Sequence, residues 1–191
     1  MNASFPKHPF DWRTLRSHYA LRDTWMTVRV DSCQMPGGQV VEPYYVLEYR
    51  DFVNVVAVTP QREVVLVRQY RHGLGRTILE IPGGVMDPGD DDTAATALRE
   101  LREETGYSGA VIEHLCTLSP NPASYTNLVH SYLLFDARPD AAAAPDEHEQ
   151  LEVVRMPLEQ VRAELRAGQF LQAMHASALF YALARLQELG I

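Results

Sequence analysis

Short apolar runs separated by turn residues recur along the chain. The runs are rich in Val, Tyr and Leu, which favour β-strands, and Pro and Gly lie between several of them. Pro36-Gly37-Gly38 separates one pair of runs, and Pro60-Gln61-Arg62 separates the next pair. Connections this short predict two antiparallel hairpins. The predicted strands are 25–30, 41–48, 52–59, 63–69, 129–135 and 151–156.

A helix is predicted between residues 93 and 105, where the composition changes to Ala, Leu, Arg and Glu. Gly106 follows at the position where a C-terminal cap is expected. Within this segment Ala94, Leu98 and Leu101 recur at helical spacing and form one apolar stripe. The stripe is expected to anchor the helix in a core and to leave its other face available for chemistry.

Two further helices are predicted at the end of the chain, at 158–167 and at about 171–189, with Gly168 as the break between them. The acidic, Ala-rich stretch 136–149 lies between the last two strands and predicts an exposed loop. Together these elements predict an α/β or α+β sandwich in which helices cover a mixed sheet.

The composition is that of a soluble protein with one main domain, since 46% of the 191 residues are hydrophobic and 22% are charged. No apolar run approaches the roughly 18 residues of a membrane helix, and residues 1–15 lack the pattern of a signal peptide, so we expect a cytoplasmic protein with no membrane partner. A net charge of −8 argues against a nucleic-acid-binding surface. Cys33 and Cys116 lack the spacing of a zinc site, and buried thiols are expected.

Three carboxylates in the predicted central helix are the main candidates for chemistry. Glu100, Glu103 and Glu104 are spaced i, i+3 and i+4, which places them on one helical face. Clustered carboxylates repel one another without a cation, and hard oxygen donors favour Mg²⁺ or Mn²⁺. The alternative is a solvated acidic face that forms ordinary surface pairs with Arg99 and Arg102.

The residues around these carboxylates resemble the Nudix box, commonly written G-x5-E-x7-R-E-U-x-E-E-x-G-U, where U is a bulky apolar residue. The segments 99–101 and 103–107 match every fixed position of its second half. In the first half, counting back from Arg99 places Asp91 in the first glutamate position, whereas counting forward from Gly84 places Asp90 there. The loop is therefore one residue longer than the pattern.

The resemblance implies a Nudix-type α/β/α sandwich with a mixed central sheet, and it covers about residues 45–185. The lead-in Leu79-Glu80-Ile81-Pro82-Gly83-Gly84 is similar to that of ADP-ribose and nucleotide-sugar pyrophosphatases. The implied reaction is Mg²⁺-dependent hydrolysis of ADP-ribose to AMP and ribose 5-phosphate, with two or three ions and Mn²⁺ as a substitute. Alternatives are another nucleotide, such as a dinucleoside polyphosphate, and a catalytically silent nucleotide-binding domain.

The same resemblance implies roles for the box residues. Glu100 and Glu104 would be the principal metal ligands, and Glu103 would be a further ligand or a group that positions water. The carbonyl of Gly83 would be a backbone ligand, and Arg99 would orient the glutamates. From the acidic loop before the last strand, Glu147 and then Glu149 are the candidates for the general base, unless that loop only solubilises the chain.

Substrate-binding residues are implied on both sides of the box. Arg71 would hold a phosphate with its planar fork of donors, and Arg50 could reach a substrate in the same way. Glu80 would face the substrate, although a solvent-exposed strand end is as good an interpretation. Pro122 lies fifteen residues past Tyr107, a spacing that is associated with ADP-ribose preference.

Residues 1–50 form a β-rich extension beyond the Nudix hydrolase domain at 51–191. In similar enzymes such extensions pair two subunits, so the resemblance implies a homodimer.

Overall fold

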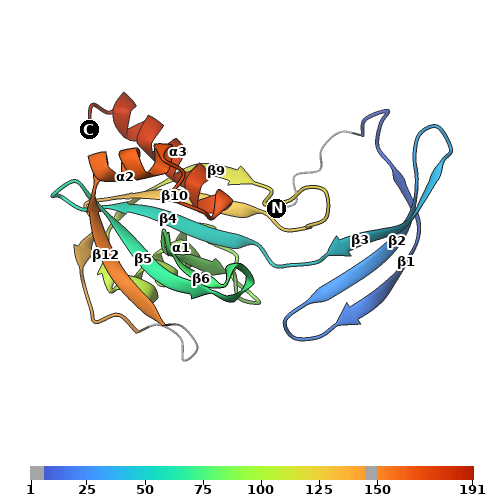
Figure 1. Cartoon of the computed structure of the whole chain (residues 1–191), viewed down its shortest axis with the longest axis horizontal. Coiled ribbons are helices and arrows are strands. Elements are labelled where there is room, and N and C mark those ends of the chain that lie inside the picture. Colours follow the sequence, from blue (N-terminus) through green and yellow to red (C-terminus); the bar gives the residue numbers. More distant parts are fainter. Residues whose placement is uncertain (1–6, 145–149) are drawn as a thin grey trace. The chain divides into compact units, whose positions relative to one another are not determined.

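The computed structural model describes residues 7–144 and 150–191. The chain divides into two compact units, one of residues 1–49 with 121–127 and one of residues 50–120 with 128–191. Figure 1 shows an antiparallel sheet in the first unit and a central sheet covered by helices in the second. The predicted fold class, an α+β sandwich with a mixed central sheet and an antiparallel N-terminal sheet, is confirmed.

The N-terminal unit is a three-stranded sheet in the order β1-β2-β3. Its strands are β1 (Arg13–Arg22), β2 (Thr27–Gln34) and β3 (Val40–Leu47). The predicted hairpin corresponds to β2 and β3, whereas β1 was not predicted. Every residue of β1 is exposed, so its polar and basic sequence carries no alternation of buried and solvated positions. The loop 121–127 joins this unit through the backbone of Leu47, whose N–H donates to the Ser124 carbonyl over 2.7 Å.

The central sheet has the order β12-β5-β4-β10-β9, with β6 paired to β5 and β7 paired to β4. The pair β4 and β10 is parallel and the other pairs are antiparallel, which makes the sheet mixed. The strands are β4 (Phe52–Val58), β5 (Glu63–Arg71), β6 (Arg76–Glu80), β7 (Gly83–Val85), β9 (Val111–Leu118), β10 (Val129–Phe135) and β12 (Leu151–Pro157). A 3₁₀ turn, His72–Leu74, links β5 to β6, and β8 (Tyr107–Ser108) pairs with β11 (Arg138–Pro139).

Helices cover both faces of this sheet because its central strands are apolar on both sides. Helix α1 (Thr93–Thr105) lies on one face, and α2 (Leu158–Arg166) and α3 (Ala173–Glu188) lie on the other. Alternate residues of β4 separate accordingly, since Val55 packs in the core below α1 while Val56 packs in the core below α2 and α3. This layering positions α1 beside β4 and β7, where the candidate residues lie.

Helix α1 has the predicted bounds, and its ends are stabilised locally. The carboxylate of Asp92 caps the start and accepts the N–H groups of Ala94 and Ala95 over 2.9 and 3.1 Å. Gly106 ends the helix with φ of 73°, a left-handed conformation that a residue with a Cβ adopts only at a cost. Leu101 is fully buried, which confirms that the apolar stripe anchors the helix.

In the part of the chain that the structure describes, no helix is long and apolar enough to cross a membrane. Both cysteines, Cys33 and Cys116, are buried free thiols, as predicted.

Candidate active site on helix α1

Two consecutive glycines allow β7 to lie close to β4 on one side and to the Glu100 side chain of α1 on the other. Gly83 pairs with Asn54 of β4, and a Cβ at Gly83 would lie only 2.3 Å from the carbonyl oxygen of Val53. A Cβ at Gly84 would lie 2.5 Å from a carboxylate oxygen of Glu100. Both distances are far below van der Waals contact, so the pairing of β7 with β4 requires glycine at position 83, and a side chain at position 84 would displace the Glu100 carboxylate.

Glu104 forms a polar link between β7 and α1. This glutamate is only 4% exposed, and its Oε2 accepts the backbone N–H of Gly83 over 3.0 Å. Glu100 precedes it by one helical turn and is half-buried beside Gly84. Two carboxylates of the predicted acidic face are therefore directed at the Gly83-Gly84 backbone. The helical conformation of α1 fixes the spacing between them.

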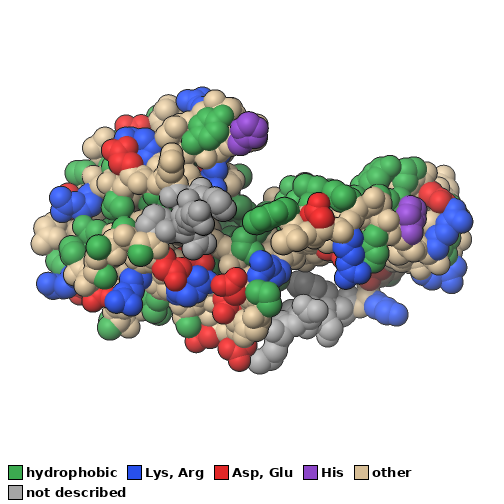
Figure 2. Space-filling view, turned by 90° about the horizontal axis from the view of Figure 1, so that it is seen from below, with side chains coloured by type: hydrophobic (Ala, Val, Ile, Leu, Met, Phe, Trp, Pro, Cys, Tyr) green, Lys and Arg blue, Asp and Glu red, His purple; other side chains and the backbone are tan. Residues whose placement is uncertain are grey.

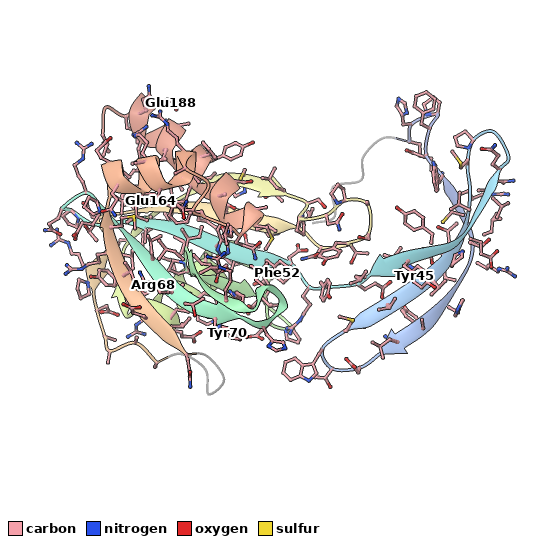
Figure 3. The ribbon with its side chains drawn as sticks, viewed as in Figure 1. Tyr45, Phe52, Arg68, Tyr70, Glu164 and Glu188 are labelled. Atoms are coloured by element: carbon pink, nitrogen blue, oxygen red, sulfur yellow. The ribbon has the colours of Figure 1, made fainter. Side chains whose placement is uncertain are left out.

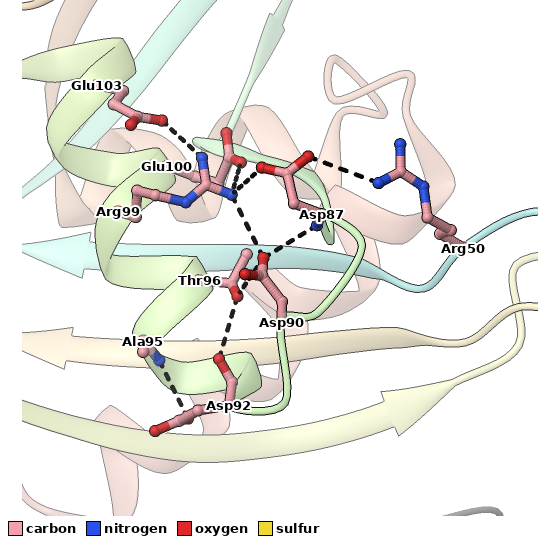
Figure 4. Close-up of polar contacts among 9 residues, drawn as sticks. All are labelled: Arg50, Asp87, Asp90, Asp92, Ala95, Thr96, Arg99, Glu100 and Glu103. Carbon is pink, nitrogen blue, oxygen red and sulfur yellow. Dashed lines mark hydrogen bonds and ion pairs between the residues drawn. The ribbon is translucent and has the colours of Figure 1, made fainter. Parts of the chain in front are cut away.

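The guanidinium of Arg99 lies among the acids at this face, as Figure 4 shows. Arg99 places Nη2 2.9 Å from Glu100 and Nη1 2.8 Å from Glu103. The same Nη2 lies 3.4 Å from Asp87 and 3.6 Å from Asp90. Burial alone would lower the pKa of Arg99, but the negative charges of Glu100 and Glu103 outweigh it and hold the pKa above its ordinary value. Arg99 is thus the cation that holds this acidic cluster together.

Asp90 and Asp91, the two candidates for the first glutamate position of the box, have different surroundings. Oδ2 of Asp90 accepts the backbone N–H of Asp87 and the hydroxyl of Thr96, each over 3.0 Å (Figure 4). These hydrogen bonds, with the charge of Arg99, lower the pKa of the Asp90 carboxyl. Asp91 is exposed. Asp90 therefore lies at the end of the lengthened loop that contacts the helix.

The donor set of this cluster suits a hard divalent cation, because it consists of carboxylate oxygens beside a backbone loop. Within residues 7–144 and 150–191, however, no group of three or more His, Cys, Asp or Glu side chains is arranged to hold a metal ion. Two of the carboxylates at this face, those of Glu100 and Glu103, form ion pairs with Arg99. A cation at this face would have to share those carboxylates with Arg99.

A second buried acid lies at the end of β6. Glu80 is fully buried, and its Oε2 receives Nε and Nη2 of Arg71 over 2.9 and 2.8 Å. The Arg71 side chain is 42% exposed, so one end of the guanidinium is held while the rest faces solvent. The interpretation of Glu80 as a solvent-exposed strand end is wrong, because β5, β6 and α3 enclose it. His175 of α3, which no motif in the sequence marks as functional, has its Nδ1 3.9 Å from Oε1 of Glu80.

The other predicted substrate residues are more dispersed. Arg50 lies 3.5 Å from Asp87, which places it at the edge of the Arg99 cluster (Figure 4). Arg68, a further arginine of β5 that is labelled in Figure 3, pairs with Glu152 of β12 over 2.7 Å. Pro122 lies in the N-terminal unit, not in the unit that carries α1.

Glu147 and Glu149 lie outside the described residues. The segment just before them contacts the end of α1, because the N–H of Ala144 donates to the Glu103 carbonyl over 2.8 Å.

Comparison with known proteins assigns most of the chain to two families. The family described as "NUDIX domain" matches residues 48–174. The family described as "Nucleoside diphosphate sugar hydrolase N-terminal domain" matches residues 12–47, which include all three strands of the N-terminal sheet.

Similar proteins cover nearly the whole chain. An ADP-ribose pyrophosphatase of Bacillus subtilis is 30% identical over 80% of this chain and 82% of its own length. A methanol dehydrogenase activator of Bacillus methanolicus is 28% identical over 94% of this chain and 95% of its own. A crystal structure of an ADP compounds hydrolase superposes with a TM-score of 0.85 at 26% identity, and covers 97% of this chain and 99% of that one.

Proposed function

The chain belongs to the NUDIX family of hydrolases, and from this premise we propose that it hydrolyses the pyrophosphate linkage of a nucleoside diphosphate sugar. ADP-ribose is the proposed substrate, and AMP and ribose 5-phosphate are the proposed products. The similarity to an ADP-ribose pyrophosphatase and to an ADP compounds hydrolase supports this choice.

The observation that carries the proposal is the packing of the α1 carboxylates on the Gly83-Gly84 backbone. Glu104 is held there by the Gly83 N–H, and Glu100 lies against Gly84. In a solvated acidic face these carboxylates would instead be exposed to water. Buried and half-buried carboxylates on one helical face suit a substrate whose charge is neutralised by a cation.

The proposed cofactor is Mg²⁺, as two or three ions, with Mn²⁺ as a substitute. Glu100, Glu103, Glu104 and the carbonyl of Gly83 are the proposed ligands, and Glu103 is also proposed to orient water. When bound, such cations offset the charge of the diphosphate and make water more acidic. Arg99 shares the carboxylates of Glu100 and Glu103 and keeps them oriented before the cation binds.

Arg71 is the proposed phosphate-binding residue. Glu80 holds its guanidinium at Nε and Nη2, which leaves the remaining donors for a substrate oxygen. Arg50, half-exposed beside Asp87, is the second candidate for a substrate contact. Pro122 is proposed to contribute to ADP-ribose preference through its loop.

In the proposed reaction a water oxygen attacks one phosphorus of the diphosphate, and the bridging P–O bond breaks. The bridging oxygen leaves with the other phosphate, and a carboxylate accepts the proton of the attacking water. Glu147 is the first candidate for this acceptor, and Glu149 is the second. No covalent intermediate with the chain is needed.

The N-terminal unit is proposed to pair two copies of the chain. Hydrophobic side chains are exposed on this sheet, part of which Figure 2 shows at the right of the view. They include Leu15, Tyr19, Leu21, Val40 and Tyr45, and Trp12 is exposed just before β1. Exposed apolar side chains that gather on one surface are a feature of protein interfaces. Sedimentation should give twice the mass of one 21.5 kDa chain, and a monomer at micromolar concentration would contradict the pairing.

The two cysteines support a cytoplasmic location. Both are buried free thiols, a state that a reducing compartment preserves.

The test is product analysis after incubation with Mg²⁺ or Mn²⁺ and one of three substrates: ADP-ribose, another nucleotide sugar or a dinucleoside polyphosphate. Release of AMP and ribose 5-phosphate from ADP-ribose supports the proposal. Faster cleavage of a dinucleoside polyphosphate would change the proposed substrate but not the proposed type of reaction. Nucleotide binding without cleavage would instead indicate a catalytically silent domain.

A further inference from the structure

Two buried polar atoms with complementary hydrogen-bonding capacity face each other between β6 and α3. Oε1 of Glu80 and Nδ1 of His175 lie 3.9 Å apart, and each is buried. Within residues 7–144 and 150–191 neither atom has a hydrogen-bond partner. Buried polar atoms are seldom left unpaired, because they lose their bonds to water without replacement.

The spacing favours direct contact over a bridging water. A water that hydrogen bonds to both atoms holds them about 4.5 Å apart or more, because two bonds of about 2.8 Å meet at a wide angle. At 3.9 Å the two side chains need only a small rotation to meet. Glu80 is already bound through its other oxygen to Arg71, so Oε1 is the atom that remains for His175.

The imidazole is neutral at physiological pH. Burial lowers the pKa of His175 to about 3, and the positive charge of Arg71 acts in the same direction. A neutral imidazole carries one N–H, which can be on either nitrogen. An acceptor beside Nδ1 favours the Nδ1–H form.

We propose that His175 is a positioning residue, which donates from Nδ1–H to Oε1 of Glu80 and thereby fixes the carboxylate that directs Arg71 toward the substrate phosphate. This inference rests on the proposed function, in which Arg71 contacts that phosphate. His175 of α3, Glu80 of β6 and Arg71 of β5 thus form a chain of contacts, called the relay below. Of these three side chains, only that of Arg71 is exposed.

A purely space-filling role does not account for this histidine. Ala178 and Leu179, three and four residues further along α3, are fully buried among apolar side chains. An apolar residue at position 175 would leave no nitrogen without a hydrogen-bond partner. A histidine there is explained by the acid that it faces.

The first test compares His175→Asn with His175→Leu, because the amide nitrogen of Asn can take the place of Nδ1 whereas Leu has no donor. For ADP-ribose with Mg²⁺, His175→Leu should raise KM about tenfold and change kcat less than about twofold. His175→Asn should keep KM within about twofold of the wild type. Equal KM values for the two variants would overturn the inference.

Leu179→Ala is the matched control, since it perturbs the same helix at a residue of the apolar core that has no polar group. It should lower the melting temperature and leave KM unchanged. In the Glu80→Gln background, His175→Leu should add little to KM, because the residue through which it acts is already altered. Full additivity of the two changes would also contradict the relay.

A second readout needs no catalysis and therefore separates this inference from the proposed function. In ¹⁵N-labelled protein, long-range imidazole spectra should show His175 as the neutral Nδ1–H tautomer, and its signal should move in Glu80→Gln. The Nε2–H tautomer would overturn the inference even if ADP-ribose is cleaved. Failure to cleave any nucleotide, with the Nδ1–H tautomer present, would overturn the proposed function and keep the hydrogen bond.

Discussion

The backbone N–H of Gly83 donates to Oε2 of Glu104 over 3.0 Å, and this bond joins the strand that leads into the site to the helix that carries its acids. Gly83 is held on its other side by β4, where it pairs with Asn54. The carboxylate of Glu104 is therefore fixed relative to the central sheet and not only relative to its own helix. Such fixing is what a reaction site requires, since it reduces the reorganisation needed when the substrate binds.

Glu104→Gln should abolish most activity without unfolding the chain. The amide oxygen of Gln can still accept the Gly83 N–H, whereas the negative charge is lost. We expect ADP-ribose cleavage with Mg²⁺ to fall about 100-fold or more. Glu159→Gln on α2 is the control, because that side chain is 75% exposed and should leave the rate unchanged. A Glu104→Gln variant with wild-type activity would remove Glu104 from the metal site.

Gly84→Ala should lower activity through a steric effect on Glu100. The added methyl would meet the Glu100 carboxylate at 2.5 Å, so the carboxylate must move away from the loop. We expect the rate of cleavage to fall at least about tenfold. We also expect this variant to bind Mg²⁺ more weakly than the wild type does. Gly37→Ala is the matched control, since a Cβ there meets nothing within 4 Å. Equal rates for the two variants would show that the close approach is not needed.

Arg99→Gln should make folding more dependent on divalent cations. Removal of the guanidinium leaves Glu100 and Glu103 without the charge that pairs them, which should lower the melting temperature in the presence of a chelator. Mg²⁺ should restore more of the stability of this variant than of the wild type. Arg102→Gln, which breaks an exposed pair with Asp140, should respond to Mg²⁺ like the wild type. A Mg²⁺ response that is the same in all three proteins would contradict metal binding at this face.

Stability should fall on the acidic side because of His175. Its pKa is lowered to about 3 in the folded chain, from the ordinary value of 6.5. As the pH falls, the unfolded chain therefore binds this proton first, so the stability is fully present above pH 6.5 and is lost progressively toward pH 3. His175→Asn should remove a slope of about 1.4 kcal/mol per pH unit from the free energy of unfolding in this range. Parallel pH profiles for variant and wild type, measured by chemical denaturation, would contradict this prediction.

Glu147→Gln and Glu149→Gln should differ in their effect on the rate. We expect Glu147→Gln to lower kcat about 100-fold and to leave KM close to the wild-type value, because a proton acceptor acts in the transition state. Glu149→Gln should have the smaller effect. Unchanged kcat in both variants would leave the proton acceptor among the α1 carboxylates.

Elements with a strong local pattern were predicted closely. Helix α1 and strand β10 have the predicted bounds, since helix formers with a glycine cap mark the first and an apolar run marks the second. Strands β1 and β9 were not predicted, because most of their side chains are not fully buried and no apolar alternation marks them. Their strand conformation comes from hydrogen bonds to β2 and β10, partners that a local pattern does not reveal.

The candidate site also contains some features that follow from the local sequence and others that depend on the tertiary structure. The amino-acid sequence by itself determined that Glu100, Glu103 and Glu104 share a helical face, because a spacing of three and four residues needs only the geometry of one helix. Only the tertiary structure decided that Glu80 is buried between Arg71 and His175, because these residues come from separate elements. Local spacing follows from the backbone repeat, whereas contacts between distant segments depend on how the sheet and its covering helices pack.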